Sequence, residues 1–229
     1  MSTDSFEAVD MAPQCCAAWG VAVRADRPCL YLKGLLSKEE CQHQLQTTGI
    51  LHDTSPRSLE IGERSEFSHS DRELSTCVWE RLKRHIPETL DGGCCMGLRT
   101  EWHNARYFPG QSVFAHMDQR QTSQEHREDP LLASRITLNV YLDEGYEGGE
   151  FVFVKGVNDD GTYEVEHTVL HPGAGDAVLF YQAVPEFSHA VPVLKSEIKT
   201  IMRSDVMYRF GSEAEADVGG VAVIGGKTM

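Results

Sequence analysis

The sequence predicts a mainly β protein whose strands form a sandwich or jelly roll, with helices on the N-terminal side. About eight short extended runs follow residue 93, and most of them alternate in polarity or are fully apolar. Turn signals rich in Gly, Pro and Asp separate the runs. Strands at this spacing are typical of double sheets and not of βαβ units.

Composition and charge narrow the class of protein. The chain has 229 residues, of which 41% are hydrophobic and 24% charged, as expected of one globular domain with a sizeable core. The formal net charge of −14 disfavours nucleic acid and other phosphate-rich partners. No apolar run approaches the ~18 residues of a membrane span, and the N-terminus lacks the pattern of a secretory signal. We therefore expect a cytoplasmic protein without membrane contact.

The seven cysteines fit that compartment. All of them lie before residue 96, their number is odd, and two pairs are adjacent, which argues against a disulfide framework. A zinc site built from residues 15–16 and 94–95 would lack CxxC spacing. Reduced, structural cysteines are expected.

The chain divides into four segments: a loose N-terminal arm over residues 1–27, a helical support region over 28–98, a β core over 99–211 and a C-terminal tail over 212–229. The support region and the core form one domain.

Two capping-box patterns mark helix starts in the support region. After a short strand over residues 28–32, the pattern SKEE at 37–40 predicts a helix as far as Gln46. The pattern SDRE at 70–73 is followed by apolar residues at helical spacing and predicts a second helix. The polar, aperiodic stretch over 53–67 predicts an exposed loop.

The β core is predicted to contain strands over residues 99–107, 112–116, 135–142, 150–154, 163–170, 177–181, 188–194 and 199–210. The longest gap, residues 119–134, is polar and aperiodic. Loops of this length are either lids over a site or surface insertions. His126 within it is expected to be solvated.

Candidate chemistry begins with His116 and Asp118 at the end of a predicted strand. Side chains two residues apart on a strand share a face. An imidazole and a carboxylate so arranged are two ligands of a 2-His-1-carboxylate site, which holds Fe(II) and leaves coordination positions open. A second His-x-Asp pair, His69 and Asp71, straddles the predicted helix start, where Asp caps free N–H groups. We interpret that pair as a helix cap.

A third ligand would be a histidine on another strand that faces the same cavity. His167 lies in an alternating polar strand and His171 lies at a turn, so both are expected to be exposed. His189 enters an apolar strand, where a lone histidine is more often a hydrogen-bonded core residue. Ten residues later begins a strand in which Lys199 and Arg203 share a face, and a buried cation needs an anionic partner.

Motifs across the core carry a family resemblance. They are RYxxGQxxxxHxD at 106–118, YLD at 141–143, EGGEF at 147–151, PGxGDA at 172–177 and HAxPV at 189–193, followed by Lys199. With them the chain resembles, over about residues 28–210, the prolyl 4-hydroxylase branch of the 2-oxoglutarate and Fe(II)-dependent oxygenases. The resemblance implies a double-stranded β-helix, a cupin-like form of jelly roll, with supporting helices before it.

The resemblance also implies roles for single residues. His116, Asp118 and His189 would be the catalytic ligands of Fe(II), to which 2-oxoglutarate chelates. Lys199 stands at the family's position ten residues after the second histidine and would bind the distal carboxylate as a compact point charge. Tyr141 matches a tyrosine that hydrogen-bonds the same carboxylate.

Three more residues are expected near the cosubstrate: Tyr107, Thr137 and Asn139. Thr137 and Asn139 share the face of Tyr141, and Tyr107 lies nine residues before His116. The alternative for both tyrosines is aromatic core packing.

Arg203 complicates the assignment of the anchor for 2-oxoglutarate. With Arg209 it forms an R-x5-R pattern, a spacing that nucleic-acid demethylases of the same superfamily use for the cosubstrate. The intervening residues differ from that pattern, and Lys199 occupies the prolyl-hydroxylase position. Arg203 is therefore expected to brace the metal ligands or to pair with a nearby carboxylate.

The reaction implied by the resemblance is decarboxylation of 2-oxoglutarate to succinate and CO2, coupled through O2 to hydroxylation of an unactivated C–H bond, with ascorbate sustaining the iron. Asp118 favours hydroxylation, because halogenating relatives carry a small residue at that position. The expected substrate is a peptidyl proline. A free amino acid, another small molecule or an alkylated nucleobase remains an alternative, as does a non-enzymatic β-sandwich binding module with structural His and Asp residues.

Overall fold

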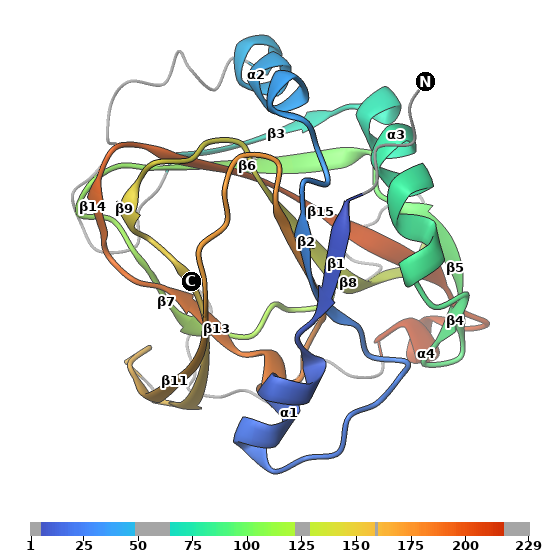
Figure 1. The fold of residues 1–229 in the computed structure, drawn as a ribbon. Helices are drawn as coiled ribbons and strands as arrows, with labels where there is room; N and C mark the ends of the chain where they lie inside the picture. The colour runs from blue at the N-terminus through green and yellow to red at the C-terminus, as the bar shows by residue number, and fades with distance from the viewer. Residues whose placement is uncertain (1–5, 49–64, 122–128, 159, 218–229) are drawn as a thin grey trace.

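The computed structural model describes residues 6–48, 65–121, 129–158 and 160–217. Within them the chain is mainly β, and every strand pair is antiparallel (Figure 1). This agrees with the predicted double sheet and excludes βαβ units from the described part of the chain.

The larger sheet has nine strands in the described residues, in the order β1-β2-β12-β8-β15-β5-β4, with β6 beside β15 and β3 beside β6. They are β1 (Glu7–Asp10), β2 (Cys29–Lys33), β3 (Ser65–Ser70), β4 (Thr89–Leu90), β5 (Gly93–Leu98), β6 (Glu101–Tyr107), β8 (Leu132–Tyr141), β12 (Ala177–Tyr181) and β15 (Lys199–Arg209). β12 is buried along its whole length, in keeping with its apolar sequence, and β8 is buried at all but its first residue although it carries several polar side chains.

The smaller sheet has the order β11-β10-β13-β7, and a two-stranded sheet pairs β14 with β9. These strands are β7 (Val113–His116), β9 (Glu147–Gly148), β10 (Phe151–Val157), β11 (Tyr163–Leu170), β13 (His189–Val191) and β14 (Leu194–Ser196). Phe151 of β10 packs on Phe180 of β12 with ring centroids 5.9 Å apart. This contact joins the nine-stranded sheet to the four-stranded sheet.

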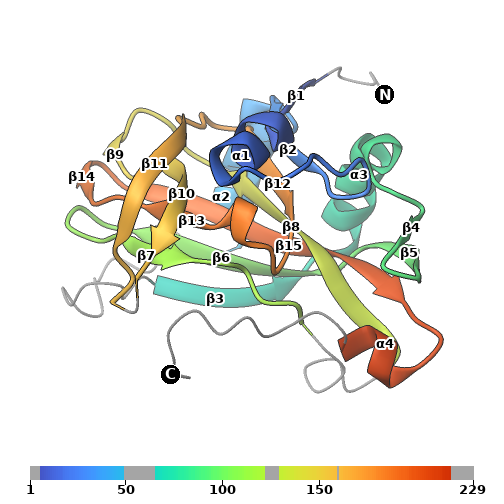
Figure 2. The same cartoon turned by 90° about the horizontal axis from the view of Figure 1, so that it is seen from below.

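Two helices begin with side-chain caps, as predicted. At α2 (Lys38–Thr47) the Glu40 N–H donates to Ser37 Oγ at 3.1 Å and the Ser37 N–H to the Glu40 carboxylate at 2.7 Å, which is the predicted capping box. At α3 (Arg72–Leu82) the cap is Asp71, whose Oδ1 accepts from the Leu74 N–H at 2.8 Å. The capping residue is thus one position later than the predicted Ser70. Ser70 is still part of β3 and pairs with Glu101 of β6. α3 packs against β5, on the opposite side of the molecule from the smaller sheet (Figure 2).

The expectation of a loose N-terminal arm is wrong for residues 6–20. β1 adds to the edge of β2, and α1 (Ala12–Trp19) follows with a proline in its first turn. α1 buries Ala12, Cys15 and Cys16, which have the i, i+3, i+4 spacing of a helix face. The pattern escaped notice because small residues carry that face and the helix has only eight residues.

Other boundaries differ from the sequence predictions. Residues 65–67 begin β3 instead of ending a loop, and the rest of the stretch 53–67 lies outside the described residues. Residues 132–134 belong to β8, and the strand expected over 188–194 is divided between β13 and β14. The short strands β4, β5 and β9 were not predicted. The 3₁₀ turns η2 (Lys83–His85) and η3 (Pro185–Phe187) complete the connections.

Part of the expected tail is ordered as well. Residues 213–217 form α4 (Glu213–Asp217), and the buried Arg135 guanidinium donates to the carbonyls of Glu215 and Ala216 at 3.2 and 2.9 Å. No helix in the described residues is long and apolar enough to cross a membrane. All seven cysteines are free thiols.

Candidate active site

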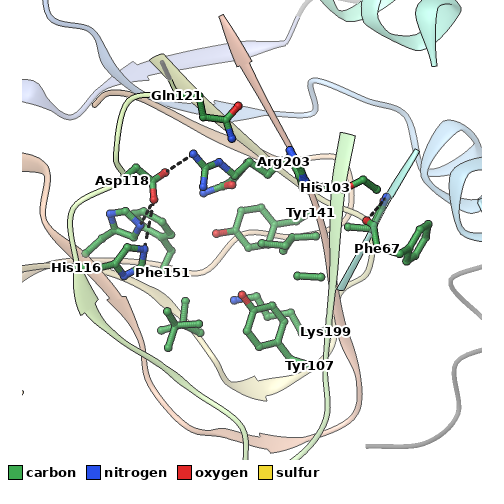
Figure 3. A pocket seen from close by; sticks show the side chains of 18 residues that line it. Phe67, His103, Tyr107, His116, Asp118, Gln121, Tyr141, Phe151, Lys199 and Arg203 are labelled. Carbon is green, nitrogen blue, oxygen red and sulfur yellow. Dashed lines mark hydrogen bonds and ion pairs between the residues drawn. The ribbon is translucent and has the colours of Figure 1, made fainter. Parts of the chain in front are cut away.

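Three potential metal ligands converge between the nine-stranded and the four-stranded sheet: His116, Asp118 and His189 (Figure 3). His116 ends β7 and His189 begins β13, and the two residues are direct partners across the strand pair. Asp118 Oδ1 lies 3.3 Å from His116 Nε2 and 3.8 Å from His189 Nε2. Among the described residues this is the one group of three or more potential ligands close enough to hold a metal, with all ligand atoms within 4.8 Å.

Backbone carbonyls orient both imidazoles. Nδ1 of His116 lies 2.8 Å from the carbonyl oxygen of Phe114, and Nδ1 of His189 lies 3.1 Å from that of Phe187. A carbonyl can only accept, so each Nδ1 carries a hydrogen, and in the neutral ring the lone pair is then on Nε2. Both lone pairs belong to the atoms that face Asp118, as metal ligation requires.

The ionisation states also suit a metal. Burial lowers the pKa of His189 to about 4, helped by the neighbouring His116, so its imidazole is neutral at pH 7. Burial alone would raise the pKa of Asp118, but Arg203 and the two imidazoles hold it well below its usual range. Two imidazoles and a carboxylate form the donor set that Fe(II) takes in oxygenases.

His189 is fixed by its neighbours. Its ring stacks on Phe151 with centroids 4.8 Å apart and meets Phe180 edge-on at the same distance. The faces and edges of the His189 ring thus pack in the core, while its Nε2 remains a potential metal ligand.

A cavity of about 330 Å³ opens beside the three side chains. It is lined by Phe67, Ser68, His103, Asn104, Ala105, Tyr107, Val113, His116, Asp118, Gln121, Asn139, Tyr141, Phe151, His189, Val191, Lys199, Ile201 and Arg203. Figure 3 shows Lys199 and Tyr107 at one end and Arg203 and Gln121 at the other, with Tyr141 between them.

Lys199 occupies a buried aromatic end of the cavity. Its side chain is 1% exposed, and Nζ donates to the Gly149 carbonyl at 2.5 Å. The ammonium also lies 5.2 Å from the ring centroids of Tyr107 and Tyr141 and 5.7 Å from that of Tyr146. Burial raises the pKa of Tyr141, so its phenol stays protonated and can donate a hydrogen bond. Tyr146 was not among the residues predicted from the sequence, although it lies next to the EGGEF motif.

Arg203 lies at the other end, beside the metal ligand. Its Nη2 is 3.6 Å from Asp118 Oδ2 and 3.3 Å from Asp205 Oδ1. Across the sheet it is the direct partner of His103 on β6 and of Asn139 on β8. Asn139 therefore lines the cavity near Arg203 and not beside Lys199.

Thr137 does not line the cavity. It is fully buried, and its hydroxyl donates to Asp118 Oδ2 at 2.7 Å. The expectation that Thr137 contacts the cosubstrate is therefore replaced by a contact with a potential metal ligand.

The other histidines considered in the sequence are not part of this group. Asp71 caps α3, and His69 Nδ1 lies 2.8 Å from the Asn104 amide nitrogen; neither His69 nor Asp71 lines the cavity. His171 is exposed, as expected. His167 is half-buried and stacks on Phe153, which corrects its predicted exposure. His126 lies outside the described residues.

Asp71→Asn is expected to leave metal binding unchanged and to cost at most ~1 kcal/mol of stability, because Asn also caps helices well. Metal stoichiometry and thermal unfolding of the purified variant test this. Loss of metal in the variant would show that His69 and Asp71 are the ligand pair.

Residues 102–203 match the model of the 2OG-Fe(II) oxygenase superfamily. The viral collagen prolyl hydroxylase of Paramecium Bursaria Chlorella virus-1, solved as a 2OG complex, is 21% identical with a TM-score of 0.54, covering 77% of this chain and 94% of that one. The prolyl hydroxylase of Trichoplax adhaerens, solved with a hypoxia inducible factor peptide fragment, is 15% identical with a TM-score of 0.55, covering 83% and 86%. The alpha ketoglutarate dependent carbocyclase SnoK from nogalamycin biosynthesis is 13% identical with a TM-score of 0.52, covering 80% and 83%. No curated protein sequence matches. At these identities the solved structures share a fold with this chain, and their substrates remain their own.

Proposed function

Since this chain belongs to the 2OG-Fe(II) oxygenase superfamily and is a 2-oxoglutarate-dependent dioxygenase, we propose that it hydroxylates a peptidyl proline on a double-stranded β-helix scaffold. One molecule of 2-oxoglutarate and one of O2 would give succinate, CO2 and the hydroxylated product. The observation that carries the proposal is the group His116, Asp118 and His189 in one cavity with a buried lysine. A binding module without catalysis would not need that combination.

Fe(II) would be held by Nε2 of His116, Nε2 of His189 and Oδ1 of Asp118. Three protein ligands leave positions for the cosubstrate and O2, and the bound metal supplies the oxidising chemistry. The chain contributes the neutral imidazole of His189 and the ionised carboxylate of Asp118. Ascorbate is proposed as the reductant that keeps the iron in its ferrous state.

The distal carboxylate of 2-oxoglutarate would lie against Lys199. A buried ammonium attracts a carboxylate more strongly than an exposed one, because the surrounding dielectric constant is low. The Tyr141 phenol would add a hydrogen bond to that carboxylate, and the rings of Tyr107 and Tyr146 would form the walls of the site. Asn139 and Arg203 would then lie on the side of the primary substrate.

Proline in a peptide is favoured as substrate by the motifs of the β core and by the likeness to two prolyl hydroxylases. The second candidate is a small molecule, which the likeness to a carbocyclase of nogalamycin biosynthesis supports at a similar TM-score. The two candidates share the metal and the cosubstrate, so only the primary substrate separates them.

Succinate release from a substrate panel tests the proposal. The panel contains proline-containing peptides, free amino acids including proline, and alkylated nucleotides, each with Fe(II), 2-oxoglutarate and ascorbate. We expect peptide-dependent succinate together with the addition of one oxygen atom to a prolyl residue, detected by mass spectrometry. Turnover with free amino acids or nucleotides alone would exclude the peptidyl assignment, and no iron-dependent succinate under any condition would exclude the reaction.

A further inference from the structure

A buried polar cluster lies directly behind Asp118. Its members are Ser134 and Thr137 on β8, Asp205 on β15, and Gln182, which follows the last residue of β12. Ser134, Thr137 and Asp205 are 0% exposed and Gln182 is 1% exposed. Polar side chains at such depth destabilise a fold unless they are hydrogen-bonded, so the contacts within this cluster decide its role.

The Gln182 amide is the centre of the cluster. Its Nε2 donates to Thr137 Oγ1 at 2.9 Å and to Asp205 Oδ1 at 2.8 Å. Its Oε1 accepts from Ser134 Oγ at 2.7 Å. In this orientation both hydrogens of the amide meet acceptors and its oxygen meets the Ser134 hydroxyl, so the amide group is fully hydrogen-bonded.

That orientation fixes the direction of the next hydrogen bond. The Thr137 hydroxyl accepts from Gln182, so its single hydrogen is directed to Asp118 Oδ2 at 2.7 Å. Asp118 Oδ2 therefore accepts a hydrogen bond from Thr137, and Nη2 of Arg203 lies 3.6 Å from the same oxygen. Oδ1 is the oxygen that faces the imidazoles of His116 and His189.

The cluster also forms hydrogen bonds with the backbone of Gln121, three residues after Asp118. The Gln121 N–H donates to Ser134 Oγ at 2.8 Å, and the Ser134 N–H donates to the Gln121 carbonyl at 3.1 Å. Gln121 lines the cavity. One set of buried hydrogen bonds thus connects a wall of the cavity to the non-ligating oxygen of Asp118.

We propose that Gln182 is a positioning residue for the metal: by ordering the Thr137 hydroxyl it holds Asp118 Oδ2 and presents Oδ1 alone as a ligand. One carboxylate oxygen at the metal, instead of two, leaves the positions that a chelating cosubstrate needs. The inference rests on the proposed assignment of Asp118 as a ligand. Partners of this kind typically change metal affinity by 10–100-fold when they are removed.

Metal binding to the apo-protein tests the inference without turnover. Co(II) is titrated by calorimetry and by its visible absorption into the wild type, Gln182→Leu, Gln182→Asn, Thr137→Val and Thr137→Ser. We expect Gln182→Leu and Thr137→Val to weaken Co(II) binding by about 10–100-fold and to alter the absorption spectrum, which reports the ligand set. Thr137→Ser keeps the hydroxyl and should stay close to the wild type. Combining Gln182→Leu with Thr137→Val should add little, because both break one chain of hydrogen bonds.

Gln44→Leu is the matched control for loss of a buried glutamine, since Gln44 is 6% exposed on α2 and does not line the cavity. It should leave Co(II) affinity and spectrum unchanged. If Gln182→Leu does not fold, Gln182→Asn decides, because the shorter side chain cannot span Thr137 and Asp205 together. Co(II) affinity and spectrum unchanged within about twofold in the folded Gln182 variants would overturn the inference. A wild-type protein that binds no Co(II) would instead overturn the proposed metal site.

Discussion

His116→Ala, Asp118→Ala and His189→Ala are each expected to lower iron-dependent succinate release by more than about 100-fold while leaving the fold in place. Changes to residues that merely support a ligand cost 10–100-fold, so loss of a ligand should cost more. Among the described residues no other group of potential ligands lies close enough to replace one of the three. Succinate release and far-UV circular dichroism, measured on the same preparations, check both parts of the expectation.

The three variants differ in what they do to the fold. The His116 side chain is 40% exposed, so its truncation removes little packing. His189 lies between two phenylalanine rings, and His189→Ala leaves a cavity there. His189→Gln fills more of that space and serves as the second variant. His171→Ala, which changes an exposed histidine outside the cavity, is the control and should turn over normally. Full activity in a variant of any of the three would remove that residue from the site.

The residues of the candidate metal site could be predicted from the sequence only in part. His116 and Asp118 followed from the two-residue period of a strand, which is a local property. His189 followed only from the family resemblance, because its pairing with His116 depends on the register between β7 and β13, which are far apart in the chain. Spacing along one strand cannot specify that register.

The roles around the ligands were harder to predict for the same reason. Thr137, Asn139 and Tyr141 alternate on β8 and share a face, yet they reach Asp118, Arg203 and Lys199 in turn. Which neighbour each of them meets depends on the register between β8 and β15 and on the path of the segment after β7. Gln182 gave no signal at all, since a single glutamine after an apolar strand is also what a turn would show.

The prediction of a loose N-terminal arm was wrong for a different reason. α1 is too short to be stable alone, and its buried face is made of alanine and cysteine, which contribute little to a periodic pattern. Its position depends on contacts with β10, β11 and η3. Local sequence could not supply them.

Lys199→Ala is expected to raise the Michaelis constant for 2-oxoglutarate by about one to three orders of magnitude. If Lys199 is the anchor, the variant leaves the distal carboxylate buried without a partner, and truncating one member of such a pair costs roughly 2–5 kcal/mol, with ~1.4 kcal/mol for each tenfold change. Lys199→Arg should rescue poorly, because the rings of Tyr107, Tyr141 and Tyr146 surround the ammonium and leave little room for a planar guanidinium. Steady-state kinetics and binding of 2-oxoglutarate to the Mn(II)-loaded protein measure the effect.

Arg203→Lys separates the two cations of the cavity. Arg203 lies beside Asp118 and Asp205, at the end of the cavity opposite Lys199, so a lysine there keeps a cation near those carboxylates (Figure 3). The Michaelis constant for 2-oxoglutarate should therefore stay within about threefold of the wild type, a change below ~0.7 kcal/mol. A tolerant Lys199 together with an intolerant Arg203 would reverse the assignment. The chain would then resemble the demethylase branch more closely, and an alkylated nucleobase would return as a candidate substrate despite the net charge of −14.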